Sequence, residues 1–384
     1  MLLKLLFRNA FRHKLRTGLT VLGICVAILA FGLLRTVVSA WYAGVDASSA
    51  SRLVTRNAIS LIFSLPISYK DKIRSVDGVS RVSYGNWFGG IYVEEKNFFA
   101  NFAIEAENYL ALYPEFILKP DEKTNFMRDR KACVVGKKLA TRFNWSINDP
   151  VTLRGTIFPG NWDFVIRAIY TGRDSGIDEN QFFFHWDYLN ETVKKNIPRR
   201  ADQVGFYMIG LKKPETAADT SLAIDRLFKN SYAETLTETE KAFQLSFISM
   251  SNAILTVIEL VSLVVIVIIM AVAANTMAMS SRERAGEYAV FKTLGFGGRF
   301  LAFLIFGESI VIATLGTGLG MALTYPAAHA FRSAVGNFFP VFQVDPHTLV
   351  LDVAAGVMIA LISAMFPAWR AVRVKIADGL GRIG

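Results

Sequence analysis

The chain has 384 residues, of which 52% are apolar and 19% charged, and its formal net charge is +10. This apolar content excludes an ordinary water-soluble protein of this length. Because the basic excess gathers beside the apolar runs, it indicates a membrane surface rather than nucleic acid as the partner. The cysteines Cys25 and Cys133 lie in an apolar run and in a polar region, so the sequence predicts no disulfide framework.

The chain begins with a basic and apolar segment over residues 1–16. Two series recur at every fourth position and would form adjacent stripes on a helix. One series is apolar and the other basic: Leu3, Phe7, Phe11 and Leu15, and Lys4, Arg8, Arg12 and Arg16. The pattern is typical of an amphipathic helix at the cytoplasmic lipid surface. It is equally typical of a positive flank that orients a first membrane span.

Four later runs have the length and apolar content of membrane spans, which need about 20 residues. The predicted spans are 17–42, 251–279, 300–325 and 348–369. The first run could also be a cleaved signal peptide ending near Val38-Ser39-Ala40, but its apolar part is longer than such segments usually are. We therefore expect an uncleaved anchor.

The distribution of lysine and arginine predicts the orientation of the spans. Residues 1–16, 280–299 and 370–384 are rich in these residues, whereas 326–347 holds only Arg332. With four spans, the three basic segments fall on one face, which the positive-inside rule makes cytoplasmic. Residues 43–250 then form one large extracytoplasmic insertion, and 326–347 a short extracytoplasmic loop.

The insertion has the pattern of a mixed α and β domain. We expect strands over 57–63, 79–93, 151–158, 162–170 and 203–211, because these runs are rich in β-branched and aromatic residues. We expect helices over 66–78, begun by Pro66 and ended by Gly78, and over 216–230. Residues 36–55 and 233–252 are predicted to be helical stalks. Aromatic runs such as 85–92, 97–102 and 181–186 fit a core, with some residues exposed for a cargo or partner.

Residues 280–299 form a charged stretch between two of the apolar runs. Tyr288, Phe291 and Leu294 recur at three-residue spacing and predict one apolar face of a short helix. Arg284 and Glu287 are spaced to form an ion pair on that helix. Glycines at 295, 297 and 298 would end it. One interpretation is a solvated hairpin, and the other is a docking helix for a cytoplasmic protein.

No pattern for catalysis or metal binding stands out. Glu259 and Glu308 lie in apolar runs at different expected depths, so a structural hydrogen bond is the default for each. The histidines His13, His185, His329 and His347 have no metal-ligand spacing. The phosphate-binding pattern G-x-x-x-x-G-K-[ST] is absent, and the nearest fragment is VVGKK at 134–138.

A family resemblance becomes specific in the segment RERAGEYAVFKTLGF and the span that follows it. The segment resembles the core motif of MacB/FtsX/LolE-type ABC transporter permeases, including the unfused type VII form. The matching positions are Glu287, Tyr288, Ala289, Val290, Lys292, Thr293, Leu294, Gly295, Glu308, Ser309, Gly316, Gly318 and Gly320. The tail FPAWRAVRVKIADGL and the strand-rich stretch from 133 to 170 also resemble this family.

The resemblance implies an α-helical membrane protein with four transmembrane helices. It also implies a mixed α+β extracytoplasmic domain inserted between the first and second of them. It further implies a permease in the bacterial inner membrane that carries no cofactor and is not an enzyme, with ATP and Mg²⁺ bound by a separate cytoplasmic ATPase. The implied ATPase-docking residues are Arg284, Glu287, Tyr288, Phe291, Lys292, Leu294 and Gly295.

Further partners follow from the same resemblance. These are a second permease copy or a related permease, membrane lipids, and, in a tripartite pump, a periplasmic adaptor and an outer-membrane channel. The implied activity is export or extraction of a lipid, lipoprotein, peptide or drug-like cargo, driven by transmitted motion. Two alternatives are an FtsX-like signal transmitter that regulates a cell-wall hydrolase, and a membrane enzyme with active carboxylates at Glu259 or Glu308.

Overall fold

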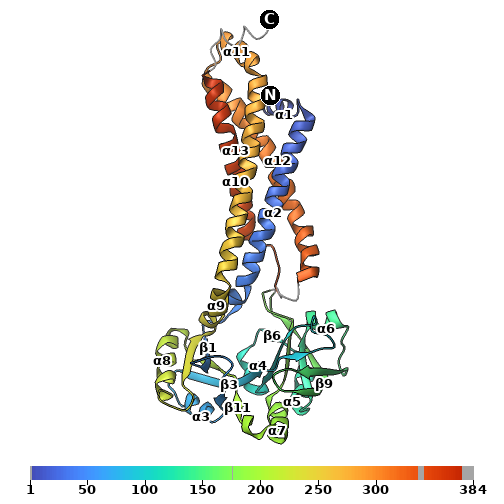
Figure 1. The fold of residues 1–384 in the computed structure, drawn as a ribbon, viewed down its shortest axis with the longest axis vertical. Helices are drawn as coiled ribbons and strands as arrows, with labels where there is room; N and C mark the ends of the chain where they lie inside the picture. Colours follow the sequence, from blue (N-terminus) through green and yellow to red (C-terminus); the bar gives the residue numbers. More distant parts are fainter. Residues whose placement is uncertain (1, 175, 336–340, 374–384) are drawn as a thin grey trace. The chain divides into compact units, whose positions relative to one another are not determined.

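The computed structural model describes residues 2–174, 176–335 and 341–373 (Figure 1). The chain forms two compact units. The first, here called the helical unit, comprises Met1–Ala40, Asn252–Val335 and Phe342–Gly384. The second, here called the sheet unit, comprises Trp41–Ser251 and Gly336–Val341. Each unit is described separately below.

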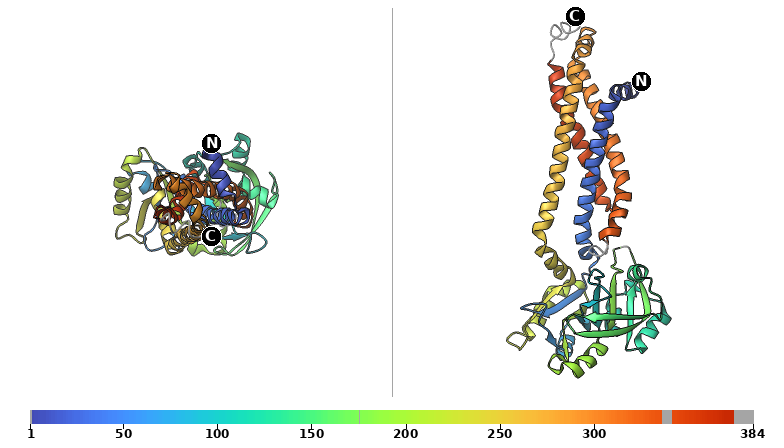
Figure 2. Two further views of the ribbon diagram at one scale, coloured as in Figure 1. Left: turned by 90° about the horizontal axis from the view of Figure 1, so that it is seen from above. Right: turned by 45° about the vertical axis from the view of Figure 1, so that its right-hand side comes forward.

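The helical unit is a bundle in which long helices run side by side, as both views of the ribbon show (Figures 1 and 2). Its long helices are α2 (Lys14–Ala47), α10 (Asn252–Glu283), α12 (Gly298–Val335) and α13 (Pro346–Val372). All four are long and apolar enough to cross a membrane. Many of their large aliphatic side chains remain exposed on the bundle, as a lipid-facing surface requires.

Glycines let the bundle helices approach closely. A Cβ on Gly316 would lie 2.7 Å from Ile24, and one on Gly320 would lie 2.8 Å from the backbone oxygen of Cys25. Gly356 of α13 likewise faces Thr317 of α12. These small-residue positions therefore pack α12 against α2 and α13 within one chain, which favours intramolecular packing over a dimer contact.

Two features of the bundle differ from the sequence expectations. Residues 1–16 do not form one helix, because α1 (Leu2–Ala10) ends before a turn and α2 begins at Lys14. Leu6, which belongs to neither predicted stripe, is buried against Gly307 of α12. The third long helix also continues past residue 325 to Val335, with Pro326 inside it. The tail motif FPAWRAVRVKIADGL covers 366–380; its first part lies in α13, and its residues from 374 onward lie outside the described residues, as does the rest of the predicted tail.

The sheet unit is built on one mixed sheet. Its strand order is β13-β1-β12-β3-β5-β10-β7-β9-β8-β4, with β6 paired to β9 and a separate pair β11-β2. The strands are β1 (Arg52–Asn57), β2 (Leu65–Pro66), β3 (Val79–Trp87), β4 (Gly90–Ile91), β5 (Ala100–Ile104), β6 (Phe116–Ile117), β7 (Ala132–Gly136), β8 (Pro150–Gly155), β9 (Gly160–Gly172), β10 (Gln181–His185), β11 (Gln203–Val204), β12 (Phe206–Leu211) and β13 (Thr235–Thr239). The expected mixed α and β architecture is therefore present.

Helices cover both faces of this sheet. They are α3 (Tyr69–Arg74), α4 (Ala106–Leu112), α5 (Pro120–Arg128), α6 (Lys137–Phe143), α7 (Trp186–Asn196), α8 (Ala217–Leu227) and α9 (Glu240–Met250), with short 3₁₀ turns at Pro198–Arg200 and Pro214–Thr216. In β10, Phe182 and Phe184 enter one core cluster and Phe183 enters the other. The run is apolar throughout because the strand is buried on both faces. This confirms the core interpretation of residues 181–186.

Several predicted elements of the sheet unit are confirmed, and others are wrong. Strands β3, β8, β9 and β12 and helix α8 lie where the sequence predicts them. Residues 57–63 are not a strand, since β1 ends at Asn57 and the following turn exposes apolar side chains, Ile62 at 89%. Pro66 lies in β2, and the helix begins only at Tyr69. The stalk predicted over 233–252 begins with strand β13 rather than helix.

Both cysteines are free and buried, Cys25 in α2 and Cys133 in β7. The other aromatic runs divide between core and surface. Phe88 and Phe99 are buried, whereas Trp87 and Phe98 are exposed and stack with their ring centres 6.2 Å apart.

Candidate functional site

The helix predicted within 280–299 exists as α11 (Ala285–Thr293), at the end of the bundle where α1 also lies (Figure 1). Tyr288 and Ala289 face the bundle and are buried. Burial raises the pKa of the Tyr288 phenol to about 12, so it stays protonated near neutral pH. The opposite face carries Glu287, Val290 and Leu294, and Leu294 is 68% exposed. The expectation that Tyr288, Phe291 and Leu294 share one apolar face is wrong, because Tyr288 lies on the inner side of the helix and Leu294 on the outer side.

Glycine ends α11 by a Schellman motif. Gly295 has φ +87°, a left-handed conformation that glycine adopts without steric cost. The Gly295 amide donates to the Lys292 carbonyl at 3.1 Å, and the Phe296 amide donates to the Phe291 carbonyl at 3.0 Å. The Phe291 and Phe296 rings meet at 5.8 Å, which is the apolar contact that usually accompanies this motif. The predicted helix stop at Gly295 is confirmed.

Arg284 does not pair with Glu287, contrary to the expectation from their spacing. Its side chain is buried and donates to Glu308 of α12 at 2.8 Å and to the Asn9 carbonyl at 2.7 Å. Helix spacing alone cannot show that a partner on another helix competes for the arginine. The structural role expected for Glu308 is therefore visible, with Arg284 as its partner.

Two further arginines connect the start of the chain to this region. Arg12, in the turn before α2, pairs with Glu287 of α11. Arg16 of α2 makes two bonds to Glu283, at 2.7 and 2.8 Å. Bidentate contacts of this kind fix orientation as well as distance. We call the six residues the coupling cluster: Arg12, Arg16, Glu283, Arg284, Glu287 and Glu308.

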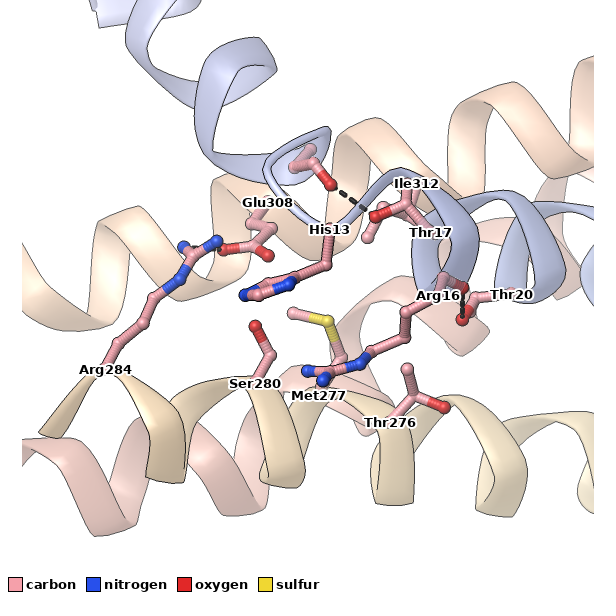
Figure 3. Close-up of a pocket in the computed structure, with 11 residues that line it drawn as sticks. His13, Arg16, Thr17, Thr20, Thr276, Met277, Ser280, Arg284, Glu308 and Ile312 are labelled. Atoms are coloured by element: carbon pink, nitrogen blue, oxygen red, sulfur yellow. Dashed lines mark hydrogen bonds and ion pairs between the residues drawn. The ribbon is translucent and has the colours of Figure 1, made fainter.

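A polar pocket lies beside the coupling cluster (Figure 3). The side chains of His13, Arg284 and Glu308 point toward the same space in this view. The pocket is lined by Ala10, His13, Arg16, Thr17, Thr20, Thr276, Met277, Ser280, Arg284, Glu308 and Ile312. It lies where α2, α10 and α12 meet, beside the end of α1.

The other predicted residues connect α11 to the fourth long helix. Lys292 donates to the Val372 carbonyl of α13 at 2.8 Å. A Cβ on Gly298, just after α11, would lie 2.8 Å from the Val372 side chain, so this approach is close. Phe291 is partly buried against the bundle core. Helix α11 therefore contacts α12, α13 and the segment before α2, and it follows α10 directly in the chain.

A second polar cluster, in the sheet unit, was not predicted from the sequence. We call it the Arg52 cluster, formed by Arg52, Glu115 and Glu240. Arg52 donates to Glu240 at 2.7 Å and to Glu115 at 2.6 Å, and all three side chains are buried. The Ser49 amide also donates to Glu240 at 2.9 Å. The cluster joins the start of β1 to the start of α9, where the chain enters and leaves the sheet.

Glu259, the other acid in an apolar run, forms an ion pair with Arg35 of α2 at 3.3 Å. The sequence places an arginine inside the first span but does not identify its partner. Among the described residues, no group of three or more His, Cys, Asp or Glu side chains could hold a metal ion.

Comparisons with known proteins agree with this arrangement. The model of the FtsX-like permease C-terminal domain matches residues 259–376. The model of the MacB-like periplasmic core domain matches residues 17–227, more than half of the chain. No curated protein matches.

Among solved structures, the extracellular domain of the noncanonic ABC-type transporter YknZ from Gram-positive bacteria is 10% identical, with a TM-score of 0.36. The match covers 49% of this chain and 100% of that one. The periplasmic region of MacB from Actinobacillus actinomycetemcomitans is also 10% identical, with a TM-score of 0.39. It covers 53% of this chain and 95% of that one.

Proposed function

The chain belongs to the family of FtsX-like permeases with a MacB-like periplasmic core domain, and we propose that it transmits motion from a separate ATPase to that domain. Permeases of this family are components of ABC-type systems and work with a cytoplasmic ABC ATPase. The proposal adds a mechanism: ATP hydrolysis moves α11, and the bundle carries that movement to the sheet unit. The single observation that supports it most is the coupling cluster.

The contacts of α11 make it suited to receive a force. The buried pair of Arg284 with Glu308 fixes the start of α11 to α12, and Arg12, in the turn between α1 and α2, pairs with Glu287 on the outer face of α11. Lys292 adds the bond to α13. A displacement of α11 therefore acts on several long helices together, because packed elements move as rigid bodies rather than deform continuously.

The outer face of α11 is suited to dock a protein. Val290 and Leu294 are exposed aliphatic residues spaced four apart, and the exposed end of Glu287 lies one turn before Val290. Phe296, just beyond the helix, adds an exposed ring. We propose that these residues enter a groove of the ATPase, while Arg284 and Tyr288 position the helix from inside.

Removing the Leu294 side chain tests the docking surface. We expect Leu294→Ala to weaken binding of the partner ATPase about tenfold or more, since central apolar anchors typically contribute over 1 kcal/mol. The ATPase would be titrated onto the full-length chain in nanodiscs, with binding and stimulated hydrolysis both recorded. The matched control is Leu260→Ala on α10, which removes the same atoms from a leucine of 58% exposure. Normal binding by Leu294→Ala would contradict docking through α11.

We propose that the sheet unit acts on the cargo, either by exporting it or by extracting it from the membrane. Export or extraction of a lipid, lipoprotein, peptide or drug-like molecule across the bacterial inner membrane fits a MacB-like domain. A second permease copy or a related permease would complete the assembly, with an adaptor and outer-membrane channel in a tripartite pump. The family matches do not favour the alternative of a signal transmitter that regulates a cell-wall hydrolase.

A further inference from the structure

Asp352 of α13 is an unusual residue in the helical unit. Its side chain is fully enclosed, at 0% exposure, and neither carboxyl oxygen has a hydrogen-bond partner among the described residues. Three other acids in long helices, Glu259, Glu283 and Glu308, each pair with an arginine. An isolated buried carboxylate is so costly that it is normally paired or neutralised. Asp352 therefore requires a counter-charge, a hydrogen-bond donor or a proton that the described side chains do not supply.

The surroundings of Asp352 are a narrow polar seam between three helices. A Cβ on Gly32 of α2 would lie 3.2 Å from the Asp352 Oδ2 atom and 3.2 Å from the Thr324 Oγ1 atom of α12. One turn further along α13, Gly356 faces Thr317, whose hydroxyl also lacks a partner. Any side chain larger than glycine at position 32 would crowd the carboxyl.

The direction of the nearby hydrogen bonds indicates what Asp352 needs. The Thr324 hydroxyl already donates to the Gly320 carbonyl at 2.9 Å, and the Thr36 hydroxyl donates to the Gly32 carbonyl at 2.7 Å. Both hydroxyl protons are therefore already used, so neither hydroxyl is available to donate to an ionised carboxylate. Protonation of Asp352 would remove the charge that these groups do not stabilise.

Among the side chains that the structure describes, none forms a hydrogen bond or ion pair with Asp352. On α2, Arg35 pairs through Nη1 with Glu259 of α10, and its Nε atom has no hydrogen-bond partner among the described residues. On α12, Glu308 precedes Thr324 by 16 residues, roughly 24 Å along a helix, and pairs with Arg284. Three further groups are exposed to the surroundings, Tyr325 and His329 on α12 and His347 on α13.

We propose that Asp352 is a proton-binding site: its carboxyl holds a proton while α2, α12 and α13 are packed in this arrangement. Separation of α13 from α2 would expose the carboxyl to water or to an arginine, and the proton would leave. The ligand is a single proton, because among the described residues no group of three or more His, Cys, Asp or Glu side chains could hold a metal ion. The proposal has two halves. The binding half, that Asp352 holds a proton in this packing, is independent of the proposed function. The release half, that helix separation frees the proton, rests on the proposed function.

Infrared spectroscopy of the full-length chain in lipid nanodiscs tests the binding half. With isotope-labelled aspartate, the wild type is expected to show the carbonyl stretch of a protonated carboxyl at neutral pH. Asp352→Asn should remove this band, and Asp345→Asn, at the exposed N-cap of the same helix, should leave it. A wild-type spectrum without the band, or a band that survives Asp352→Asn, would overturn the proposal.

Thermal stability gives an independent readout. The proton is bound by the folded seam, so raising the pH should lower the unfolding temperature of the wild-type helical unit relative to that of Asp352→Asn. Asn resembles the protonated carboxyl in shape and cannot ionise, so Asp352→Asn should lose this dependence and Asp345→Asn should keep it. If Asp352→Asn and the wild type lose stability in parallel as the pH rises, the site does not hold a proton.

Proton release is measured separately, with the docked ATPase turning over in weakly buffered solution with a pH indicator dye. Beyond the protons from ATP hydrolysis, the wild type should show a transient release that Asp352→Asn lacks. Equal traces would refute release while leaving the infrared result intact. Failure of the ATPase to bind at all would instead contradict the proposed function, so the two failures are distinguishable.

Discussion

At the scale of single residues, burial determines how much an ion pair matters. Arg284 and Glu308 have side chains 6% and 8% exposed, whereas Arg35 and Glu259 are 24% and 51% exposed. Removing one partner of a buried pair leaves an uncompensated charge, which typically costs about 3–5 kcal/mol. An exposed pair contributes about 0–1 kcal/mol where water solvates the remaining charge, which for Glu259 requires that its side chain reach the interface near the outer end of its span.

Substitution of the two acids should therefore have unequal effects. We expect Glu308→Gln to lower the unfolding free energy of the full chain by about 3–5 kcal/mol, and Glu259→Gln by about 0–1 kcal/mol. Chemical denaturation in detergent micelles would measure both. Equal losses for the two variants would show that Arg284 finds another partner and that the buried pair does not fix α11.

His185 should make the sheet unit sensitive to acid. Burial lowers the pKa of its imidazole, and although Asp187 and Asp129 act in the opposite direction, the shift remains downward. Its Nε2 atom lies 2.7 Å from the Phe126 carbonyl oxygen. The unfolded chain thus binds a proton more readily than the folded one. The stability from neutral His185 is present above about pH 6.5, the ordinary histidine pKa, and is lost as the pH falls.

The test compares unfolding temperatures at about pH 8 and about pH 5, where an ordinary histidine changes charge. His185→Gln can still donate to the Phe126 carbonyl but cannot gain a proton, so its loss on acidification should be smaller than that of the wild type. His347→Gln removes an exposed histidine and should behave as the wild type does. Identical acid responses in all three chains would rule out His185 as the source.

Sequence reasoning at this scale found the acids but not their partners. Glu308 is recognisable because it interrupts an apolar run, yet its arginine lies 24 residues earlier on another helix. Spacing suggested Glu287 for Arg284, since local pairing is all that a one-dimensional pattern can show. Asp352 is visible in the same way, as a single break in the fourth span, but its lack of partners emerges only in three dimensions.

At the scale of elements, close packing between helices depends on particular glycines. Gly316 and Gly320 contact α2, whereas Gly318, between them, has nothing within 4 Å of its Cβ position. The three glycines differ only in the side of α12 on which they lie: Gly316 and Gly320 face α2, and Gly318 faces away from it. Gly318 therefore provides an internal control for the seam between α2 and α12.

We expect Gly320→Ala to destabilise the bundle by about 1–3 kcal/mol, the usual cost of overpacking, because the new methyl meets the backbone oxygen of Cys25. Gly318→Ala should be neutral or stabilising by up to about 1 kcal/mol, since alanine favours helix. Denaturant titration of the two variants is the measurement. A larger loss at position 318 than at position 320 would contradict the described packing.

Elements with a strong pattern were predicted well, and weaker ones were not. The strands β8 and β9 alternate clearly and pair as expected. The apolar run at 57–63 looked like a strand, but its side chains remain exposed in a turn, and hydrophobicity does not reveal which apolar residues the core can accommodate. Pro66 was also over-interpreted, since it was expected to begin a helix and lies in a strand.

At the scale of the whole molecule, the Arg52 cluster lies where the chain enters and leaves the sheet unit. Arg52 is surrounded by Glu115, Glu240 and the Tyr113 ring, 4.2 Å from the ring centre. If motion enters this unit through the end of α2 and the start of α9, it acts first on this cluster, because Glu240 of α9 is bonded to Ser49 and Arg52 at the start of β1. Its members are far apart in the sequence, which is why no local pattern revealed it.

Arg52→Met should leave two buried glutamates without a cation and lower the unfolding free energy by about 3–5 kcal/mol. The control is Arg56→Met on the same strand. Arg56 has a single acidic partner, Glu238, which is less buried, so its loss should lower the unfolding free energy clearly less. If Arg52→Met still folds at low temperature, the chain should bind the ATPase normally. The conformational change that ATPase binding causes in the sheet unit should become smaller. A wild-type response in Arg52→Met would show that the cluster is not on the route.

The four long helices and the mixed domain between the first two agree with the sequence expectation, because long apolar runs identify spans directly. The orientation predicted from lysine and arginine stays a prediction. The cargo was not accessible, because binding depends on which aromatic side chains the fold leaves at the surface. Trp87 and Phe98 are exposed and stacked, although their sequence context resembles that of buried Phe88 and Phe99.

The enclosure of both native thiols has a practical consequence. Because Cys25 and Cys133 are buried, a membrane-impermeant maleimide should react slowly with the unmodified chain. A cysteine introduced at Tyr232, 97% exposed in the sheet unit, or at Leu294 would then report its own compartment. In intact spheroplasts the first should be modified and the second protected until the cells are lysed.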